Sequence, residues 1–370
     1  MKIGIDARYA NRELSEGFAV VIFNLIKNLT RIDLKNKYIL YFDKPLRRDI
    51  FLNQVNFKFK VIQAPLFWTN LRLPLELMLS DKPDIFFFPA QYISWYRPFK
   101  TVVIIYDLAF LQFPQCFETK NRILLTKLTA YSAKYADKII TCSHSTKSDI
   151  IKFYKISPDK ISVIYWGVDE EFTPIKDYHS IEKVKTKYNI KNYILYTGVL
   201  QPRKNLIRLI EAFNVLKNEK NLDLMLVISG KKGWFYDKIF QRVEKLKLNK
   251  DVIFTDYVSK EELQLLINGA EVFILPSLYE GFGLPLLEAM ACGTPVITSN
   301  VSSMPEVVGD AGILINPYSI EEISKAINNI LTDRQLRETM VNKGLERAKL
   351  FPWGNAARET LKVFEEVYRR

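Results

Sequence analysis

The chain has 370 residues, too many for one ordinary hydrophobic core and suited to two domains. Apolar residues make up 48% and charged residues 25%, which is the composition of a folded soluble protein. Three cysteines and two histidines argue against a disulfide framework and a histidine-based metal site. There is no leader-like N-terminal pattern, and the most apolar stretch, residues 101–113, is too short to span a bilayer. We therefore expect a cytoplasmic protein.

The formal charge is +12, and most of the excess lies in the first half. Residues 1–175 carry 25 Lys and Arg against 17 Asp and Glu, whereas the remainder carries 28 against 24. A basic surface attracts polyanions: nucleic acid, anionic lipid headgroups or a phosphorylated substrate. A coding preference for lysine explains the excess equally well.

Short β-rich apolar runs alternate with segments of helical period through both halves, which is typical of parallel sheets covered by helices. In the first half we expect strands at Lys2–Ile5, Tyr38–Phe42, Phe57–Val61, Ile85–Phe88, Thr101–Tyr106, Lys138–Cys142 and Ile161–Ile164. The helices expected there include Phe18–Thr30, Asn121–Tyr135 and Ser143–Phe153.

In the second half the predicted strands are Tyr193–Thr197, Asp223–Ser229, Val252–Phe254, Val272–Leu275, Pro295–Thr298 and Ile313–Ile315. The predicted helices are Asn205–Lys217, Asp237–Lys245, Lys260–Asn268, Pro285–Ala291, Ile320–Leu331 and Asp333–Leu350. Between Gly167 and Lys191 the periodicity gives way to charged residues, so we place the first domain at 1–172 and the second at 173–354. A last helix is expected at Asn355–Arg370.

The segment from Leu275 to Pro285 predicts an anion-binding loop. A buried strand ends at Leu275, two glycines follow, and a helix opens at Pro285. Such a helix N-terminus offers free N–H groups and a positive dipole end, which suit a phosphate or a sugar hydroxyl. Glu280 in the loop and Glu288, expected in the first helical turn, can accept hydrogen bonds from vicinal hydroxyls. The alternative is a tight turn with a solvated acid.

A second cluster, Arg203-Lys204, also follows a strand and precedes a helix. Two cations at a helix N-terminus are electrostatically unfavourable, because the helix dipole is already positive there. A dianionic group bound between them would offset this repulsion. In the first half, Asp107 comes just after a buried strand, where ligands of parallel sheets bind. An aspartate there is as often a turn cap as a functional acid.

With these motifs in place, the second half resembles the retaining GT-B glycosyltransferases of the family-4 class, which share a Glu, seven residues, Glu motif. Within that class the sequence motifs are similar to those of mannosyltransferases of O-antigen and polysaccharide synthesis. The match runs through residues 198–205, 230–234, 276–296 and 302–312, and more thinly through 3–8, 106–110 and 166–169. The resemblance implies an α/β GT-B fold: two Rossmann-like parallel-sheet domains facing across a cleft, with helix 355–370 packed back on the first.

The resemblance also implies roles for single residues. Arg203 and Lys204 would hold the donor diphosphate, Glu288 the ribose, and Glu280 the donor sugar, with Asp107 facing that sugar. Tyr257 and Val258 would lie beside the base, and Gly17 would let the first-domain loop approach the diphosphate. The substrate-binding positions implied in this way are Gly17, Tyr106, Gly198, Tyr257, Val258, Phe282, Gly283, Leu284 and Glu288.

Two positions depart from the family pattern. Tyr106 stands where the family usually has His, which puts the histidine's contact with the sugar in doubt. The N-terminal loop has Gly17 as its one glycine in Ser15-Glu16-Gly17-Phe18, fewer than usual.

The expected activity is transfer of a hexose, above all mannose from GDP-mannose, to a lipid-linked or polysaccharide acceptor with retention. No Asp-X-Asp motif and no nucleophile stand out, so we expect neither metal nor cofactor, and front-face attack assisted by the diphosphate. The alternatives are a UDP-sugar donor (glucose, GlcNAc or galactose) and a nucleotide-sugar 2-epimerase. We do not expect nucleic acid to bind, because two carboxylates would repel a polyanion.

The segment Lys120–Lys138 combines five basic residues with an apolar face. This pattern suits a membrane surface that carries a lipid-linked acceptor, and it also fits a core-packing helix with solvated lysines. A peripheral contact with the inner membrane is therefore a hypothesis. Trp68, Trp95 and Tyr96 are aromatic candidates for the acceptor side.

Overall fold

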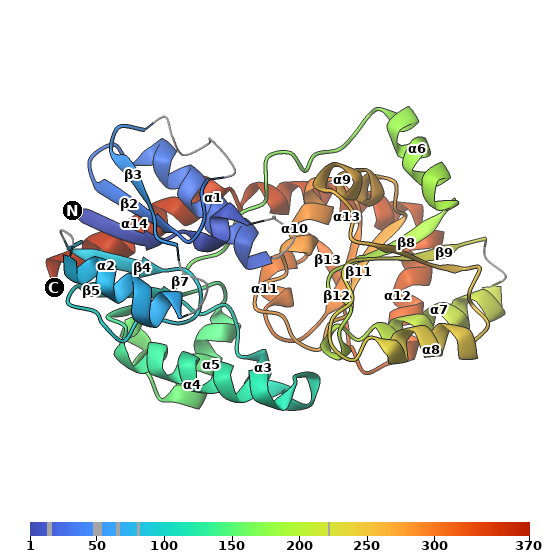
Figure 1. Cartoon of the computed structure of the whole chain (residues 1–370). Helices are drawn as coiled ribbons and strands as arrows, with labels where there is room; N and C mark the ends of the chain where they lie inside the picture. Colours follow the sequence, from blue (N-terminus) through green and yellow to red (C-terminus); the bar gives the residue numbers. More distant parts are fainter. Residues whose placement is uncertain (13–16, 47–53, 64–66, 80–81, 221–222) are drawn as a thin grey trace. The chain divides into compact units, whose positions relative to one another are not determined.

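The computed structural model describes residues 1–12, 17–46, 54–63, 67–79, 82–220 and 223–370. The chain divides into two compact units (Figure 1). The first comprises residues 1–111, 119–167 and 353–370, and the second comprises 112–118 and 168–352.

The first unit is built on a parallel seven-stranded sheet whose central strands are buried, whereas the edge strand Phe57–Val61 is mostly exposed. In spatial order the strands are β3 (Phe57–Val61), β2 (Lys37–Phe42), β1 (Lys2–Asp6), β4 (Ile85–Phe88), β5 (Lys100–Ile104), β6 (Lys138–Thr141) and β7 (Ile161–Val163). The order reverses between β1 and β4, so the loops that follow these two strands diverge at the carboxyl edge, where ligands of such sheets bind.

Helices cover this sheet, and one of them returns from the far end of the chain. They are α1 (Gly17–Ile32), α2 (Leu73–Leu79), α3 (Ala109–Gln112), α4 (Thr119–Tyr135), α5 (His144–Tyr154) and α14 (Trp353–Arg369). Phe364 of α14 packs against Phe87 with ring centroids 5.2 Å apart, and Glu366 pairs with Lys138 at 3.0 Å. The last helix thus completes the core of the first unit, beside α1 in Figure 1.

The second unit repeats the plan with a parallel six-stranded sheet. The strand order is β10 (Val252–Asp256), β9 (Met225–Ser229), β8 (Tyr193–Thr197), β11 (Val272–Leu275), β12 (Val296–Ser299) and β13 (Gly312–Ile315). The helices are α6 (Tyr178–Tyr188), α7 (Leu206–Lys220), α8 (Asp237–Lys245), α9 (Lys260–Asn268), α10 (Leu284–Ala291), α11 (Met304–Val308), α12 (Ile320–Thr332) and α13 (Arg334–Lys349). Here the order reverses between β8 and β11, the two strands that precede Arg203-Lys204 and the glycine loop.

Each of the thirteen predicted strands is found within the described residues, with ends that differ by two residues at most. One prediction is wrong: residues 178–188, interpreted as part of a charged join, form helix α6. Asp177 caps its first turn, and Ile181 and Val184 are buried, so two apolar residues suffice to dock a lysine-rich helix. Contacts divide the chain at residues 167/168 and 352/353, whereas the predicted boundaries are 172/173 and 354/355.

Candidate donor site

The site begins with the loop between β11 and α10, residues 276–283. β11 is fully buried, and Gly283 has φ 107°, a left-handed conformation that β-carbon sterics disfavour in other residues. Gly283 occupies the N-cap of α10, and Pro285 lies in the first turn, where its missing N–H costs nothing. This end of α10 has no side-chain cap, an arrangement that suits the binding of an anion or a hydroxyl.

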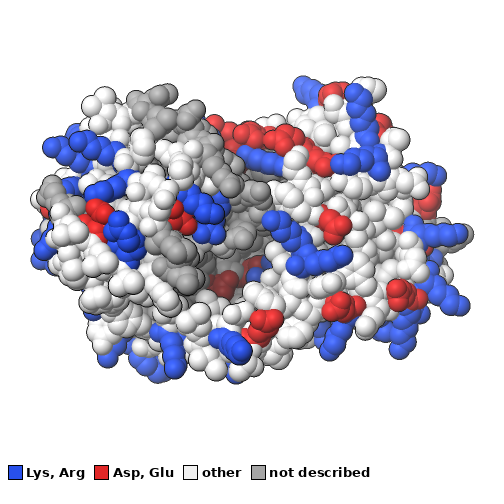
Figure 2. Space-filling view, in the orientation of Figure 1, with Lys and Arg blue, Asp and Glu red and all other residues white. Residues whose placement is uncertain are grey.

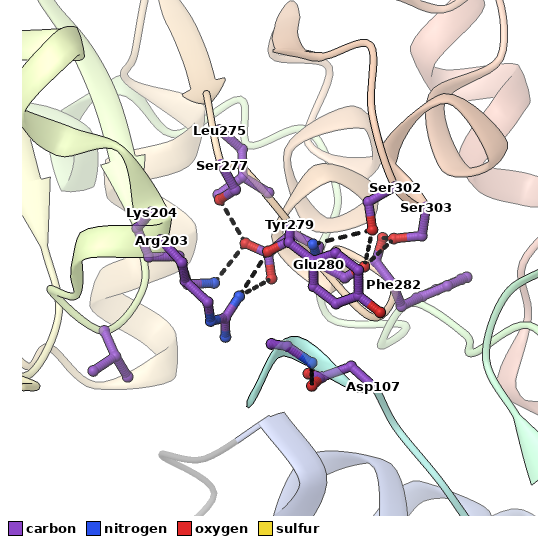
Figure 3. Close-up of polar contacts among 12 residues, drawn as sticks. Asp107, Arg203, Lys204, Leu275, Ser277, Tyr279, Glu280, Phe282, Ser302 and Ser303 are labelled. Carbon is purple, nitrogen blue, oxygen red and sulfur yellow. Dashed lines mark hydrogen bonds and ion pairs between the residues drawn. The ribbon is translucent and has the colours of Figure 1, made fainter. Parts of the chain in front are cut away.

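Glu280 in this loop contacts both predicted cations (Figure 3). Its Oε1 lies 2.6 Å from Lys204 Nζ, and its Oε2 lies 3.2 Å from Arg203 Nη1. The Ser277 hydroxyl donates to Oε1 at 2.6 Å. Burial alone would raise the pKa of Glu280, but the two cations and the hydrogen bonds outweigh it and lower the pKa to about 2. The cluster therefore holds two positive charges and one negative charge.

Arg203 and Lys204 lie in a short 3₁₀ turn that precedes α7. The turn is fixed to the glycine loop by backbone contacts: Leu278 N donates to Arg203 O at 2.8 Å, and Arg203 Nη1 donates to Tyr279 O at 2.8 Å. Asn205, with φ 62°, donates from Nδ2 to Pro276 O at 3.0 Å. The loops after β8 and β11 are therefore one hydrogen-bonded assembly.

Two glycines bring the loops after β8 and β9 together. Gly198 has φ 144° and Gly230 has φ 148°, and a β-carbon on Gly230 would lie 2.0 Å from the carbonyl oxygen of Gly198. Leu200 N donates to Lys231 O, and Gly233 N donates to Leu200 O, which continues the pairing beyond the strands. A side chain at Gly230 would force these loops apart, whereas a β-carbon on Gly198 would lie 2.8 Å from the Tyr196 hydroxyl.

Ser302 and Ser303 support the glycine loop from the other side, a role that sequence reasoning missed. Ser302 Oγ donates to Glu280 O at 2.6 Å, and Ser303 Oγ lies 3.0 Å from Glu280 O and 2.9 Å from Phe282 O. Ser303 is fully buried. Because these hydroxyls engage the loop's carbonyls, they fix the peptide orientation on which its N–H groups depend. The available signal was a polar pair just after the buried strand β12.

Glu288 has the opposite environment from Glu280. It is the fifth residue of α10, so the expectation that it lies in the first turn is wrong, because the helix begins at Leu284. Burial raises the pKa of Glu288 to about 7, with Lys260 lowering it and Asp169 raising it further. Glu280 is therefore ionised at neutral pH, whereas Glu288 titrates near neutral pH.

Tyr257 and Val258 follow β10 on the same edge of the sheet. The Tyr257 ring is 49% exposed, with Lys231 Nζ 4.8 Å from its centroid, and Val258 is buried. Gly230 N donates to Asp256 O, so the loop that carries Lys231 is bonded to the end of β10. An exposed aromatic face here can stack a planar ring.

The remaining predicted residues belong to the first unit. Tyr106 is half-buried and donates its hydroxyl to Pro89 O at 2.7 Å, and desolvation of that hydroxyl raises the pKa of Tyr106 well above the usual value. Asp107 Oδ1 accepts from Ala109 N at 2.9 Å, so this aspartate caps a turn. Gly17 is the exposed first residue of α1, with open space around it. Ser15 and Glu16 of the same loop lie outside the described residues.

Two predictions about the first unit need correction. Lys138 does not belong to the basic helix: α4 ends at Tyr135, and Lys138 begins β6, buried and paired with Glu366. Trp68 is also buried, with Nε1 donating to Ile62 O at 2.8 Å and the Arg8 guanidinium 4.0 Å from its ring, so it serves the core. Trp95 is 53% exposed, with its ring centroid 6.1 Å from that of Tyr96, and both stay candidates for the acceptor side.

Comparisons with known proteins agree with this geometry. The profile described as Glycosyltransferase Family 4 matches residues 15–172, and that of Glycosyl transferases group 1 matches residues 177–347. The O-antigen chain mannosyltransferase B of Escherichia coli is 33% identical over 290 residues, which cover 78% of this chain and 76% of that protein. The chain is a family 4 glycosyltransferase. This glycosyltransferase is an enzyme with the fold that its motifs predict, two parallel-sheet α/β domains of the GT-B type.

Two further likenesses extend the comparison. The serotype-specific mannosyltransferase WbdA of Escherichia coli is 31% identical over 287 residues, covering 75% of this glycosyltransferase, which spans only about a third (34%) of WbdA. The solved structure of sucrose-phosphate synthase from Thermosynechococcus elongatus matches with a TM-score of 0.77 at 18% identity, covering 100% of this chain and 99% of that one. The second likeness supports the fold alone.

Searches for a membrane span and for a metal site give negative results within the described residues. None of the helices described there combines the length and the apolar character that crossing a bilayer requires. Nor does the described part of the chain gather three His, Cys, Asp or Glu side chains in a metal-binding arrangement.

On the face visible in Figure 2, basic and acidic groups are interspersed.

Proposed function

We propose that this enzyme is a retaining hexosyltransferase that transfers mannose from GDP-mannose to a lipid-linked or polysaccharide acceptor of cell-surface glycan synthesis. The names of the two Escherichia coli relatives support mannose as the sugar. The single observation that carries the proposal is the contact of Glu280 with both Arg203 and Lys204. Glu280 is a carboxylate that can accept hydrogen bonds from a sugar, and Arg203 and Lys204 are cations that can bind a diphosphate. Their contact places the two kinds of group in one largely buried cluster.

The charges of the cluster fit the leaving group. Arg203, Lys204 and Glu280 sum to one positive charge, which a donor diphosphate would complement. The guanidinium can fork onto two phosphate oxygens, and the ammonium acts as a point charge. Negative charge on the diphosphate grows as the bond to the sugar breaks, so cations fixed in advance by Glu280 stabilise the transition state more than the ground state.

The backbone and the second carboxylate complete the proposed donor site. The N–H groups at Phe282, Gly283 and Leu284 would meet the distal phosphate and the sugar hydroxyls at the start of α10. Glu288 in its ionised form would accept hydrogen bonds from the ribose, and Tyr257 would stack on the base. The close approach of Gly198 to Gly230 would leave the diphosphate access to the backbone between them.

The proposed chemistry needs no resident metal or cofactor. The two cations would stabilise the departing diphosphate, and no side chain in the cluster is a free nucleophile, since Glu280 is engaged by three donors. The acceptor hydroxyl would attack on the face from which the diphosphate leaves, and a phosphate oxygen would take its proton. This route retains the anomeric configuration. Asp107 Oδ1 accepts from Ala109 N, and the second carboxylate oxygen would accept from a sugar hydroxyl.

The proposed acceptor side is a membrane surface on the cytoplasmic face. In α4, Ile123 and Leu124 are exposed, and the buried positions are the small residues Thr129, Ser132 and Ala133. Exposed apolar residues next to basic ones suit an interface of anionic lipids. Cosedimentation with anionic vesicles should fall in an Ile123→Ser, Leu124→Ser double variant; undiminished cosedimentation would argue against α4 as the contact.

A donor panel tests the proposal directly. Incubation of acceptor-bearing membrane extract with GDP-mannose, and in parallel with the UDP-sugars of glucose, GlcNAc and galactose, should release GDP alone, and the anomeric proton signal of the glycosylated acceptor should report retention. Release of UDP would favour the UDP-sugar alternative. A change of the sugar without release of nucleoside diphosphate would instead indicate a 2-epimerase.

A further inference from the structure

Lys260, the first residue of α9, is bound between two carboxylates. Its Nζ lies 2.6 Å from Asp169 Oδ2 and 2.8 Å from Glu171 Oε2. A cation at a helix N-terminus faces a positive dipole end and is disfavoured there, so these two pairs account for its position. Burial works against the charge of Lys260, but the carboxylates outweigh it and raise its pKa.

Asp169 and Glu171 belong to the crossover segment, residues 168–175, with which the chain enters the second unit. Two more residues on the same face of α9 hold this segment, because Gln264 and Asn268 follow Lys260 at intervals of four. Gln264 Nε2 donates to the carbonyl of Glu171. Asn268 Nδ2 donates to Thr173 O at 3.2 Å, and its Oδ1 accepts from Ile175 N at 2.7 Å.

Glu288 on α10 lies within the field of the same charges. Lys260 on α9 and Asp169 in the crossover segment are the ionised groups that act on it, with opposite signs. Cys292, one turn further along α10, stays a neutral thiol, because burial and Glu288 raise its pKa to about 12.

We infer that Lys260 is a positioning residue of the donor site, which binds the crossover segment to α9 and offsets the Asp169 charge that acts on Glu288. The inference rests on the proposed function, because it needs Glu288 to receive the ribose. An ionised carboxylate accepts hydrogen bonds from ribose hydroxyls more strongly than a neutral acid does. Lys260 therefore favours the ionised form of Glu288, the form that would bind the nucleotide, at neutral pH. In this role it acts through its charge and not through contact with the nucleotide.

The test measures the affinity for GDP, without any sugar, by isothermal titration between pH 6 and pH 9. Lys260→Met should move the pH at which affinity is half lost to a higher value and weaken binding at pH 7 roughly threefold to tenfold. Asp169→Asn should move it to a lower value. The double variant should return close to the wild-type profile, because both charges that act on Glu288 are then gone.

Two comparisons separate this role from a merely structural one. If Lys260 only fastened the crossover segment, Lys260→Met would weaken GDP binding by the same factor at every pH, and that result would overturn the inference. Lys187→Met is the matched control, since it removes the ion pair with Glu262 on the same helix and should leave the profile unchanged. Thermal melts of each variant check that the fold is kept.

The outcome also distinguishes the inference from the proposed function. If the wild-type protein binds neither GDP nor UDP at any pH, the proposed function fails first. If the wild type binds GDP with a pH-dependent affinity and the Lys260→Met profile is unshifted, the proposed function stands and the inference is wrong.

Discussion

Lys204 Nζ lies 2.6 Å from Glu280 Oε1, although the two residues are 76 positions apart in the chain. The first follows β8 and the second follows β11, strands that are neighbours at the point where the sheet order reverses. This adjacency makes two separate sequence motifs one site. It also fixes the cation in the absence of a donor, so under the proposed function we expect Lys204 to stabilise the transition state more than the bound substrate.

Replacing Lys204 tests that contribution. Lys204→Ala should lower kcat by roughly a hundredfold or more, the usual cost of a lost preorganised donor, with a smaller change in the donor KM. Initial rates of nucleoside diphosphate release measure both constants. Lys231→Ala is the comparison, because Lys231 lies over Tyr257, the residue proposed to stack on the base, and the variant should change mainly KM. Near-normal turnover in Lys204→Ala would contradict its role.

The charge of Glu280 predicts a pH-dependent stability. Its pKa is lowered to about 2 from 4.5, so its stabilising effect is fully present above pH 4.5 and is lost as the pH falls through about 2. Glu280→Gln should therefore lower the free energy of unfolding at pH 7 by at most about 3 kcal/mol, and by less at pH 3. Urea unfolding at the two pH values measures the difference. An equal loss at both would show that packing, and not charge, is responsible.

Glu288 should behave in the opposite sense. Its pKa is raised to about 7, so the folded protein binds this proton more tightly than the unfolded chain, and stability falls as the pH rises from 4.5 through 7. Glu288→Gln should raise the free energy of unfolding at pH 8, by at most about 3 kcal/mol, and leave it unchanged at pH 4. The same variant should raise the donor KM. A loss of stability at pH 8 would contradict the burial argument.

Nucleotide binding should also release protons. If the ribose selects the ionised form of Glu288, GDP binding at pH 7 expels the proton from the protonated fraction. Isothermal titration in two buffers of different ionisation enthalpy measures this release, which should vanish in Glu288→Gln. Proton uptake on binding would mean that the neutral carboxyl is the form that meets the ribose.

Two glycines should respond differently to alanine. A β-carbon on Gly230 would lie 2.0 Å from Gly198 O, and φ is 148° there, so Gly230→Ala should destabilise the second unit by more than about 2 kcal/mol. Gly17 opens α1 with free space around it, so Gly17→Ala should leave the melting temperature unchanged. If Gly17 admits the diphosphate, this alanine should still slow turnover. Unchanged turnover would remove Gly17 from the site.

The sequence predicted the sheets well because each buried strand is a short apolar run between turn residues, as in Tyr193–Thr197 and Val272–Leu275. It missed α6, because only Ile181 and Val184 of that helix are buried and lysines dominate the pattern. The cations and Glu280 were found as separate motifs, and only the strand order brings them into contact. Ser303 was missed although it belongs to a polar pair just after β12, since a buried serine that supports a loop looks like any other serine in the sequence.

The most direct test of the account follows nucleoside diphosphate release from GDP-mannose by phosphorus NMR, with wild-type enzyme and with Lys204→Ala side by side. The account predicts that wild-type enzyme releases GDP in the presence of acceptor-bearing membrane extract and that Lys204→Ala releases it at least roughly a hundredfold more slowly. Equal release by the two proteins would contradict the assigned site. Absence of release from every sugar nucleotide in the panel, with none of them bound, would contradict the proposed function.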